Sequence, residues 1–118
     1  VKNTKILEVV NKYRKFFEEE VVPNEKYSHD EVIFWCNADD ILAHCHSMLS
    51  GVEEFIASGD NDKRDRGLVR FGFIQGGLWA TGHYSVAELK SHNRPDVGTI
   101  NEQTHEQLTK EDLEDFEY

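Results

Sequence analysis

The fold is decided by a polar turn and the apolar segment that follows it, residues 59–82, GDNDKRDRGLVRFGFIQGGLWATG. Apolar side chains in this segment recur every three or four residues, which predicts a helix from about Asp62 to Gly82. Gly59 suits the left-handed position that commonly follows a helix end, so a preceding helix should end near Ser58. A short turn between two long helices predicts an antiparallel hairpin.

The segment before the turn forms the other arm of the hairpin. Ser28 with Glu31 three residues later is a capping box, and Tyr27 against Val32 is the matching hydrophobic staple. We therefore predict one helix from Ser28 to Ser58. Its apolar line consists of Ile41, Cys45, Met48, Val52 and Phe55.

Shorter helices flank the hairpin. An amphipathic stripe predicts a first helix over about residues 4–20, closed by Pro23. A second capping box, Ser85 with Glu88, predicts a short helix over residues 85–91. The expected fold class is all-α, with a helical domain over residues 1–98. Residues 99–118 form an acidic C-terminal segment, either helical or mobile.

Composition limits the classes of function. The chain has 118 residues, of which 38% are hydrophobic and 31% charged, as expected for one globular domain. A formal net charge of −10 argues against direct nucleic-acid binding, because phosphate recognition needs a basic face. No apolar run reaches the length of a membrane span. Lys2, Lys5 and Lys12 interrupt any signal-peptide core, so a cytoplasmic location is expected.

The segment over residues 62–82 is apolar on two sides. At 100° per residue, one face carries Leu68, Phe71, Ile74, Gln75, Leu78 and Trp79, and the opposite face carries Val69, Phe73, Gly76, Gly77 and Ala80. A helix that is apolar on both sides is expected to be buried on both sides. One side faces the preceding helix. The second side therefore predicts a homo-oligomer, most simply a twofold dimer, with small residues that allow close helix packing.

Several polar side chains surround the same segment and its exit. They are Arg70, Gln75, Trp79, His83, His92, Asn93 and Arg94. An aromatic ring, an amide and two arginines could together bind a nucleotide. The same side chains suit a polar contact between helices, in which Gln75 and Trp79 find hydrogen-bond partners. We favour the second interpretation and keep nucleotide binding as an alternative.

A metal site is a further alternative. Asp40 and His44 lie one turn apart on the predicted long helix, and Asp39 and His46 lie on its other flank. Carboxylate and imidazole groups are ligands for zinc and related metals, but each flank needs donors from another helix. We favour a solvated Asp–His pair, and we expect no metal and no cofactor. A metal-dependent hydrolase using Asp40, His44 and a histidine of a neighbouring helix stays open.

Part of the chain resembles a known group of proteins. The stretch RFGFIQGGLW over residues 70–79, followed by Tyr84-Ser85, Glu88-Leu89-Lys90 and His92-Asn93-Arg94-Pro95, resembles small helical proteins of bacteriophage genomes. The resemblance covers about residues 70–95. It implies an accessory role in the host cytoplasm, such as binding a host protein or countering a defence system.

These observations predict a non-enzymatic protein-interaction or regulatory module. The positive grounds are the two-sided helix, its glycines and the acidic C-terminal segment, all of which suit association. The negative ground is that no recognisable nucleophilic or phosphate-binding motif is present. An oligomeric nucleotide-binding protein is the first alternative, and a metal-dependent hydrolase is the second.

Overall fold

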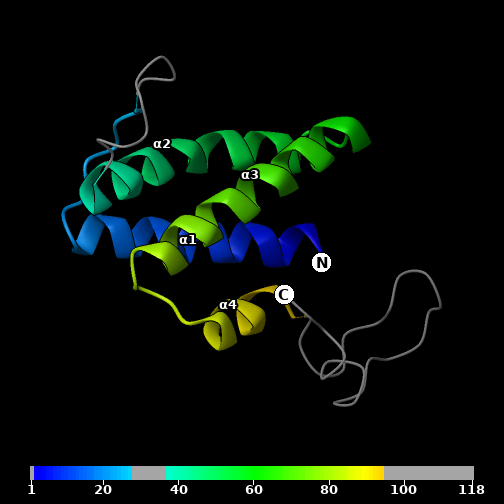
Figure 1. Cartoon of the computed structure of the whole chain (residues 1–118). Coiled ribbons are helices and arrows are strands. Elements are labelled where there is room, and N and C mark those ends of the chain that lie inside the picture. Colours follow the sequence, from blue (N-terminus) through cyan, green and yellow to red (C-terminus); the bar gives the residue numbers. More distant parts are fainter. Residues whose placement is uncertain (1, 28–36, 95–118) are drawn as a thin grey trace.

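The computed structural model describes residues 2–27 and 37–94, and within these ranges the chain forms helices and no strands. The predicted all-α fold class is thereby confirmed. In Figure 1, α2 lies above α1 and α4 lies below it, while α3 runs obliquely across them. The helices are α1 (Asn3–Glu19), α2 (Ala38–Ala57), α3 (Asn61–Ala80) and α4 (Val86–Asn93).

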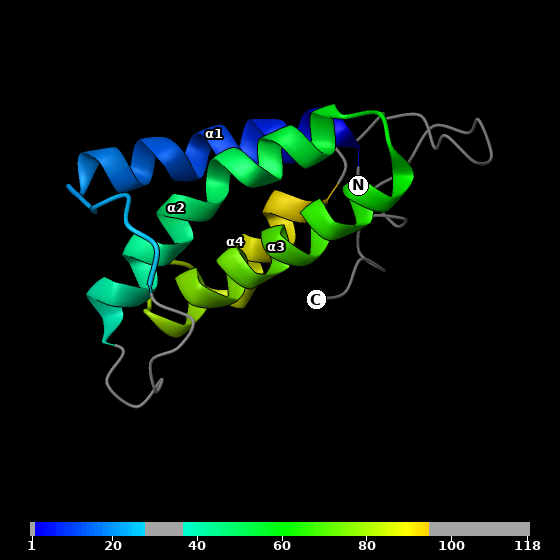
Figure 2. The same cartoon turned by 90° about the horizontal axis from the view of Figure 1, so that it is seen from above.

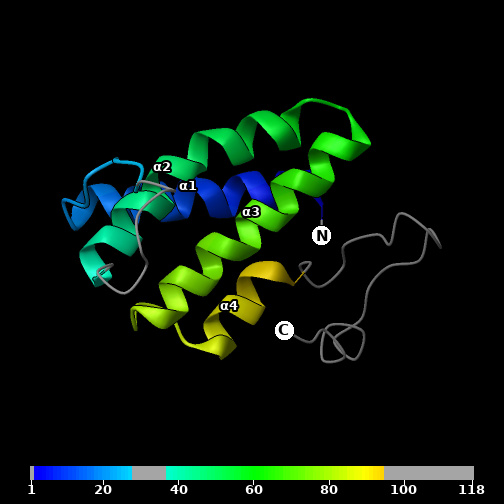
Figure 3. The ribbon, with the colours of Figure 1, turned by 45° about the horizontal axis from the view of Figure 1, so that its top comes forward.

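Helices α2 and α3 form the predicted antiparallel hairpin, which Figure 3 shows with its turn at the upper end. Gly59 in the turn has a φ of +77°, a left-handed conformation that glycine adopts without steric cost. The Asp60 side chain accepts a hydrogen bond from the backbone N–H of Lys63 at 3.1 Å and so caps α3. Turn and cap together fix where the chain reverses.

The start of α2 differs from the prediction. Asn37 is extended, and its side chain accepts a hydrogen bond from the backbone N–H of Asp40 at 2.9 Å. The Asp40 carboxylate accepts one in return from the backbone N–H of Asn37 at 3.2 Å. This capping box begins α2 at Ala38, so a continuous helix from Ser28 is wrong. The capping box predicted at Ser28 lies outside the described residues.

Helix α1 ends in a turn that normally uses glycine. Val21 has a φ of +55°, and its backbone N–H donates to the carbonyl of Glu18 at 3.2 Å. The backbone N–H of Val22 donates to the carbonyl of Phe17 at 2.8 Å. This Schellman pattern ends the helix before Pro23 is reached. Helix α3 ends in the same pattern with Gly82 in the left-handed position, at a φ of +80°.

The core lies where α1 and α3 pack against α2 and where α4 closes the space between α1 and α3 (Figure 2). Helices α1, α2 and α3 each contribute one stripe of buried apolar residues, and α4 contributes Leu89; the second apolar side predicted for α3 is exposed. Helix α4 begins at the predicted capping box, in which Ser85 and Glu88 exchange hydrogen bonds of 3.1 Å. The largest fully buried apolar side chains are Tyr13, Phe17, Ile6, Leu49, Ile74, Leu78 and Leu89.

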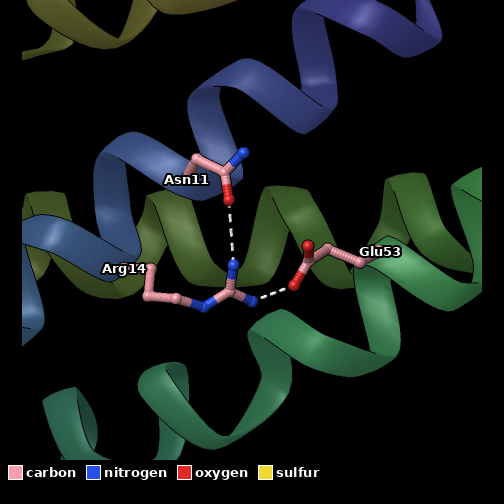
Figure 4. A network of polar contacts seen from close by, with 3 residues as sticks. All are labelled: Asn11, Arg14 and Glu53. Atoms are coloured by element: carbon pink, nitrogen blue, oxygen red, sulfur yellow. Dashed lines mark hydrogen bonds and ion pairs between the residues drawn. The ribbon is translucent and has the colours of Figure 1, made fainter.

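A half-buried ion pair joins α1 to α2. The Arg14 guanidinium lies between Glu53 of α2 and Asn11 of its own helix, and donates to the Asn11 side chain at 2.9 Å (Figure 4). The two contacts hold the guanidinium in one orientation beside the core. Within the described ranges, no helix combines the length and the hydropathy that crossing a bilayer requires.

Candidate functional site

One side of α3 is covered by neither α1 nor α2. Val69 is 75% exposed, Phe73 56% and Trp79 57%. The small residues between and beside them are exposed as well. We call this surface the outer face of α3; it consists of Val69, Gly72, Phe73, Gly76, Trp79 and Ala80.

The outer face differs from the predicted one at three residues, because Gly72 and Trp79 lie on it and Gly77 does not. Trp79 was expected on the core face but is exposed, because Leu78 completes the buried stripe and the next residue turns away by 100°. Gly77 was expected beside Gly76 but faces α2. A Cβ atom on Gly77 would lie 2.7 Å from the Cys45 sulfur and 3.3 Å from Ile41 Cγ2. The missing side chain of Gly77 therefore lets α3 pack closely against Cys45 and Ile41 of α2.

Gly72 and Gly76 have a different environment. A Cβ atom on either residue would have no heavy atom within 4 Å, apart from the nearby backbone of α3 itself and the two neighbouring residues. The fold of one chain therefore does not require glycine at these two positions. Phe73 lies between them in sequence and is only partly exposed, because its ring also contacts α2. It meets the His44 ring edge-on, with ring centroids 5.9 Å apart.

The inner side of α3 takes part in a buried polar cluster. The side-chain amide nitrogen of Gln75 donates to the Tyr13 hydroxyl at 3.0 Å and to the Asn93 side-chain oxygen at 2.8 Å. The Asn93 amide nitrogen donates back to Gln75 at 3.1 Å. The Tyr13 hydroxyl lies 2.8 Å from His92 Nδ1, so the cluster joins α1, α3 and α4. Full pairing of this kind makes a buried polar group tolerable in a core.

Charge at the cluster is restricted by burial. Burial lowers the pKa of His92, Lys12 and Lys5 lower it further, and Glu88 opposes them. Burial, followed by the charges of Glu88 and Glu19, raises the pKa of Tyr84, whose ring packs edge-on against His92 at 5.0 Å. His92 is thus held in its neutral form, and the cluster serves as a structural contact between helices.

The seven residues predicted to bind a ligand do not share one site. Gln75, His92 and Asn93 converge in the buried cluster, in line with the polar-contact interpretation. Arg70 places its guanidinium 4.5 Å from the centroid of the Phe55 ring. His83 packs against Phe16 with ring centroids 5.0 Å apart. Trp79 is on the outer face, and Arg94 is half-buried after α4.

Tyr13 completes the cluster but was not predicted as part of it. It is fully buried in the apolar stripe of α1 and stacks on Phe71 with ring centroids 6.1 Å apart. Its position in the stripe concealed its role, because a tyrosine there looks like an ordinary core residue. The available signal was its hydroxyl, since a buried hydroxyl needs a hydrogen-bond partner.

Three of the four residues considered for a metal, Asp40, His44 and His46, have structural roles. Asp40 caps α2, and Asp39 is exposed. His44 Nδ1 accepts a hydrogen bond from the backbone N–H of Tyr27 at 3.1 Å. His46 Nδ1 lies 2.9 Å from the carbonyl of Val22 and so donates to it. The two imidazoles thus fasten the chain after α1 to α2. No group of three potential metal ligands occurs among the residues whose positions are described.

Comparison of the chain with known protein families, curated proteins and solved structures finds no match.

Proposed function

We propose that the protein is a non-enzymatic protein-interaction module, and that the outer face of α3 docks an apolar helix of a protein partner. The observation that carries the proposal is the exposure of Val69, Phe73 and Trp79 on one helix face. Single exposed apolar residues are common on protein surfaces. Three large ones on one face, with exposed glycines between them, are typical of a contact surface.

The two exposed glycines support the same proposal. A glycine inside a helix costs about 1 kcal/mol relative to alanine, and nothing in the chain itself occupies the space beside Gly72 or Gly76. A closely packed partner would account for glycine at these positions, because a residue without Cβ lets another backbone approach. Between residues 69 and 80 the only charged side chain is Arg70, which is engaged with Phe55. The outer face can therefore be covered without burying a charge.

Photo-crosslinking tests the proposal. A benzophenone amino acid replaces Val69, the most exposed of the three large residues of the outer face, and in a control protein it replaces the exposed Glu54 of α2. We expect a covalent protein adduct from position 69 and none from position 54. The substitution Gly76→Leu fills open space, so it should keep the fold and abolish the adduct.

The adduct must depend on the outer face for the proposal to stand. Circular dichroism establishes that each variant keeps its helices. Equal adduct yields from positions 69 and 54, or a yield that Gly76→Leu leaves unchanged, would refute a docking role for this face.

A further inference from the structure

We infer that the helix docked on the outer face of α3 is α3 of a second copy of this chain, lying antiparallel about a twofold axis. The inference rests on the proposed function and adds the identity and register of the partner. It follows from the order of large and small residues along the face. The large residues Val69 and Phe73 come first, and the small residues Gly76 and Ala80 come second.

An antiparallel pairing makes this order self-complementary. We place the twofold axis perpendicular to the two helices, at the level midway between Ile74 and Gln75. Val69 of one copy then lies level with Ala80 of the other. In the same register, Phe73 lies level with Gly76. Each large side chain then meets a small residue, as an isologous interface requires. The exposed Phe73 ring fills the space beside Gly76 that its own chain leaves open.

The remaining large residue of the outer face follows the same rule. Trp79 and Gly72 lie on the same flank of α3 at 100° per residue. In the register above, the Trp79 ring of one copy lies within about 3 Å, along the helix axis, of the level of Gly72 of the other. All three exposed large apolar side chains of α3 therefore face an exposed small residue.

A parallel pairing does not have this property. It would place Phe73 against Phe73 and Gly76 against Gly76, which crowds one level and leaves a gap at another. The antiparallel pairing also sets the positive end of each helix dipole beside the negative end of the other.

Disulfide trapping tests both the partner and the register. Phe73→Cys and Gly76→Cys are made separately in a Cys36→Ser background, and Cys45 stays because it is buried. Mixing the two proteins under mild oxidation should give a disulfide-linked dimer severalfold faster than either protein alone. The substituted sites would face each other with the short Cβ separation that a disulfide needs. Glu54→Cys mixed with Gly76→Cys is the matched control and should link only slowly.

Light scattering gives a second readout. The unmodified protein should have twice the mass of one chain, and Gly76→Leu should have the mass of one chain while retaining its helices. Faster linking of Phe73→Cys to itself than to Gly76→Cys would overturn the antiparallel register.

The outcomes separate this inference from the proposed function. A photo-adduct at position 69 whose added mass is that of a different protein, such as a host factor, would overturn the second copy as partner and leave the docking function in place. A monomeric protein without any adduct at position 69 would overturn both.

Discussion

Gly76 and Gly77 are neighbours in sequence and lie in opposite environments. Gly77 lies against α2, where a Cβ atom would be 2.7 Å from the Cys45 sulfur, while beside Gly76 there is open space. The hairpin thus needs one of the two glycines for its own packing, and the other contributes nothing to the fold of a single chain. The same difference separates the inner side of α3, with its paired polar cluster, from its exposed outer face. Packing within one chain accounts for the residues of the inner side but not for those of the outer face.

The largest expected effect comes from filling the inner glycine. Gly77→Leu should lower the free energy of unfolding by about 3 kcal/mol, because the added side chain forces α2 and α3 apart. Urea denaturation followed by circular dichroism measures the loss. Gly76→Leu is the matched control and, at a protein concentration low enough for a single chain, should stay within about 1 kcal/mol of the unmodified protein. Equal losses in the two variants would remove the distinction between the two faces.

The second effect tests the polar part of the inner side. Gln75→Leu should lower the free energy of unfolding by about 2 kcal/mol, because Asn93 and the Tyr13 hydroxyl lose a buried partner. Tyr13→Phe leaves the Gln75–Asn93 pair intact and should cost less. An unchanged urea midpoint for Gln75→Leu would show that the cluster adds nothing to stability.

The third effect is a dependence of stability on pH. The pKa of His92 is lowered in the folded chain, so the unfolded chain binds a proton more readily and acid favours unfolding. The contribution of the neutral His92 to the free energy of unfolding should be fully present above the unfolded pKa of about 6.5 and should fall as pH drops below it. For one group the slope is at most about 1.4 kcal/mol per pH unit. The slope should be smaller in His92→Gln than in the unmodified protein, and equal slopes would exclude His92 as its source.

The smallest effect is a gain in stability from a substitution on the outer face. Gly76→Ala should raise the free energy of unfolding by about 1 kcal/mol, through helix propensity alone. The measurement is made at a protein concentration low enough for a single chain, since association would add its own stability. Gly77→Ala under the same conditions should show no such gain, because its Cβ meets Cys45. A loss of stability for Gly76→Ala would mean that the space beside it is not open.

The sequence predicted the helices where local signals and packing agree. The turn at Gly59 and the capping box at Ser85 were correct because each depends on residues within one turn of the chain. The start of α2 was misplaced because the capping box that begins it, Asn37 with Asp40, was not identified from the sequence. The end of α1 at Glu19 lies one residue from the predicted end, but the turn after it was not anticipated, because valine is uncommon in the left-handed conformation of Val21.

The sites were harder to predict than the fold. A helical wheel assigns residues to faces but does not show where a neighbouring helix stops covering them, so Trp79 and Gly77 were placed on the wrong sides. The buried cluster needed contacts between residues as distant as Tyr13 and His92. Gln75 could be identified because an amide on an apolar face requires partners. Its partners could come only from the arrangement of α1 and α4.

The contact between Gly77 and Cys45 also gives the molecule an internal reporter. The thiol is fully buried and lies beneath the backbone of α3, so a reagent can reach it only when the two arms of the hairpin separate. In a Cys36→Ser protein, the rate at which iodoacetamide modifies Cys45 therefore measures how often the hairpin opens. A ligand or partner that holds the arms together would reveal itself by slowing that one reaction.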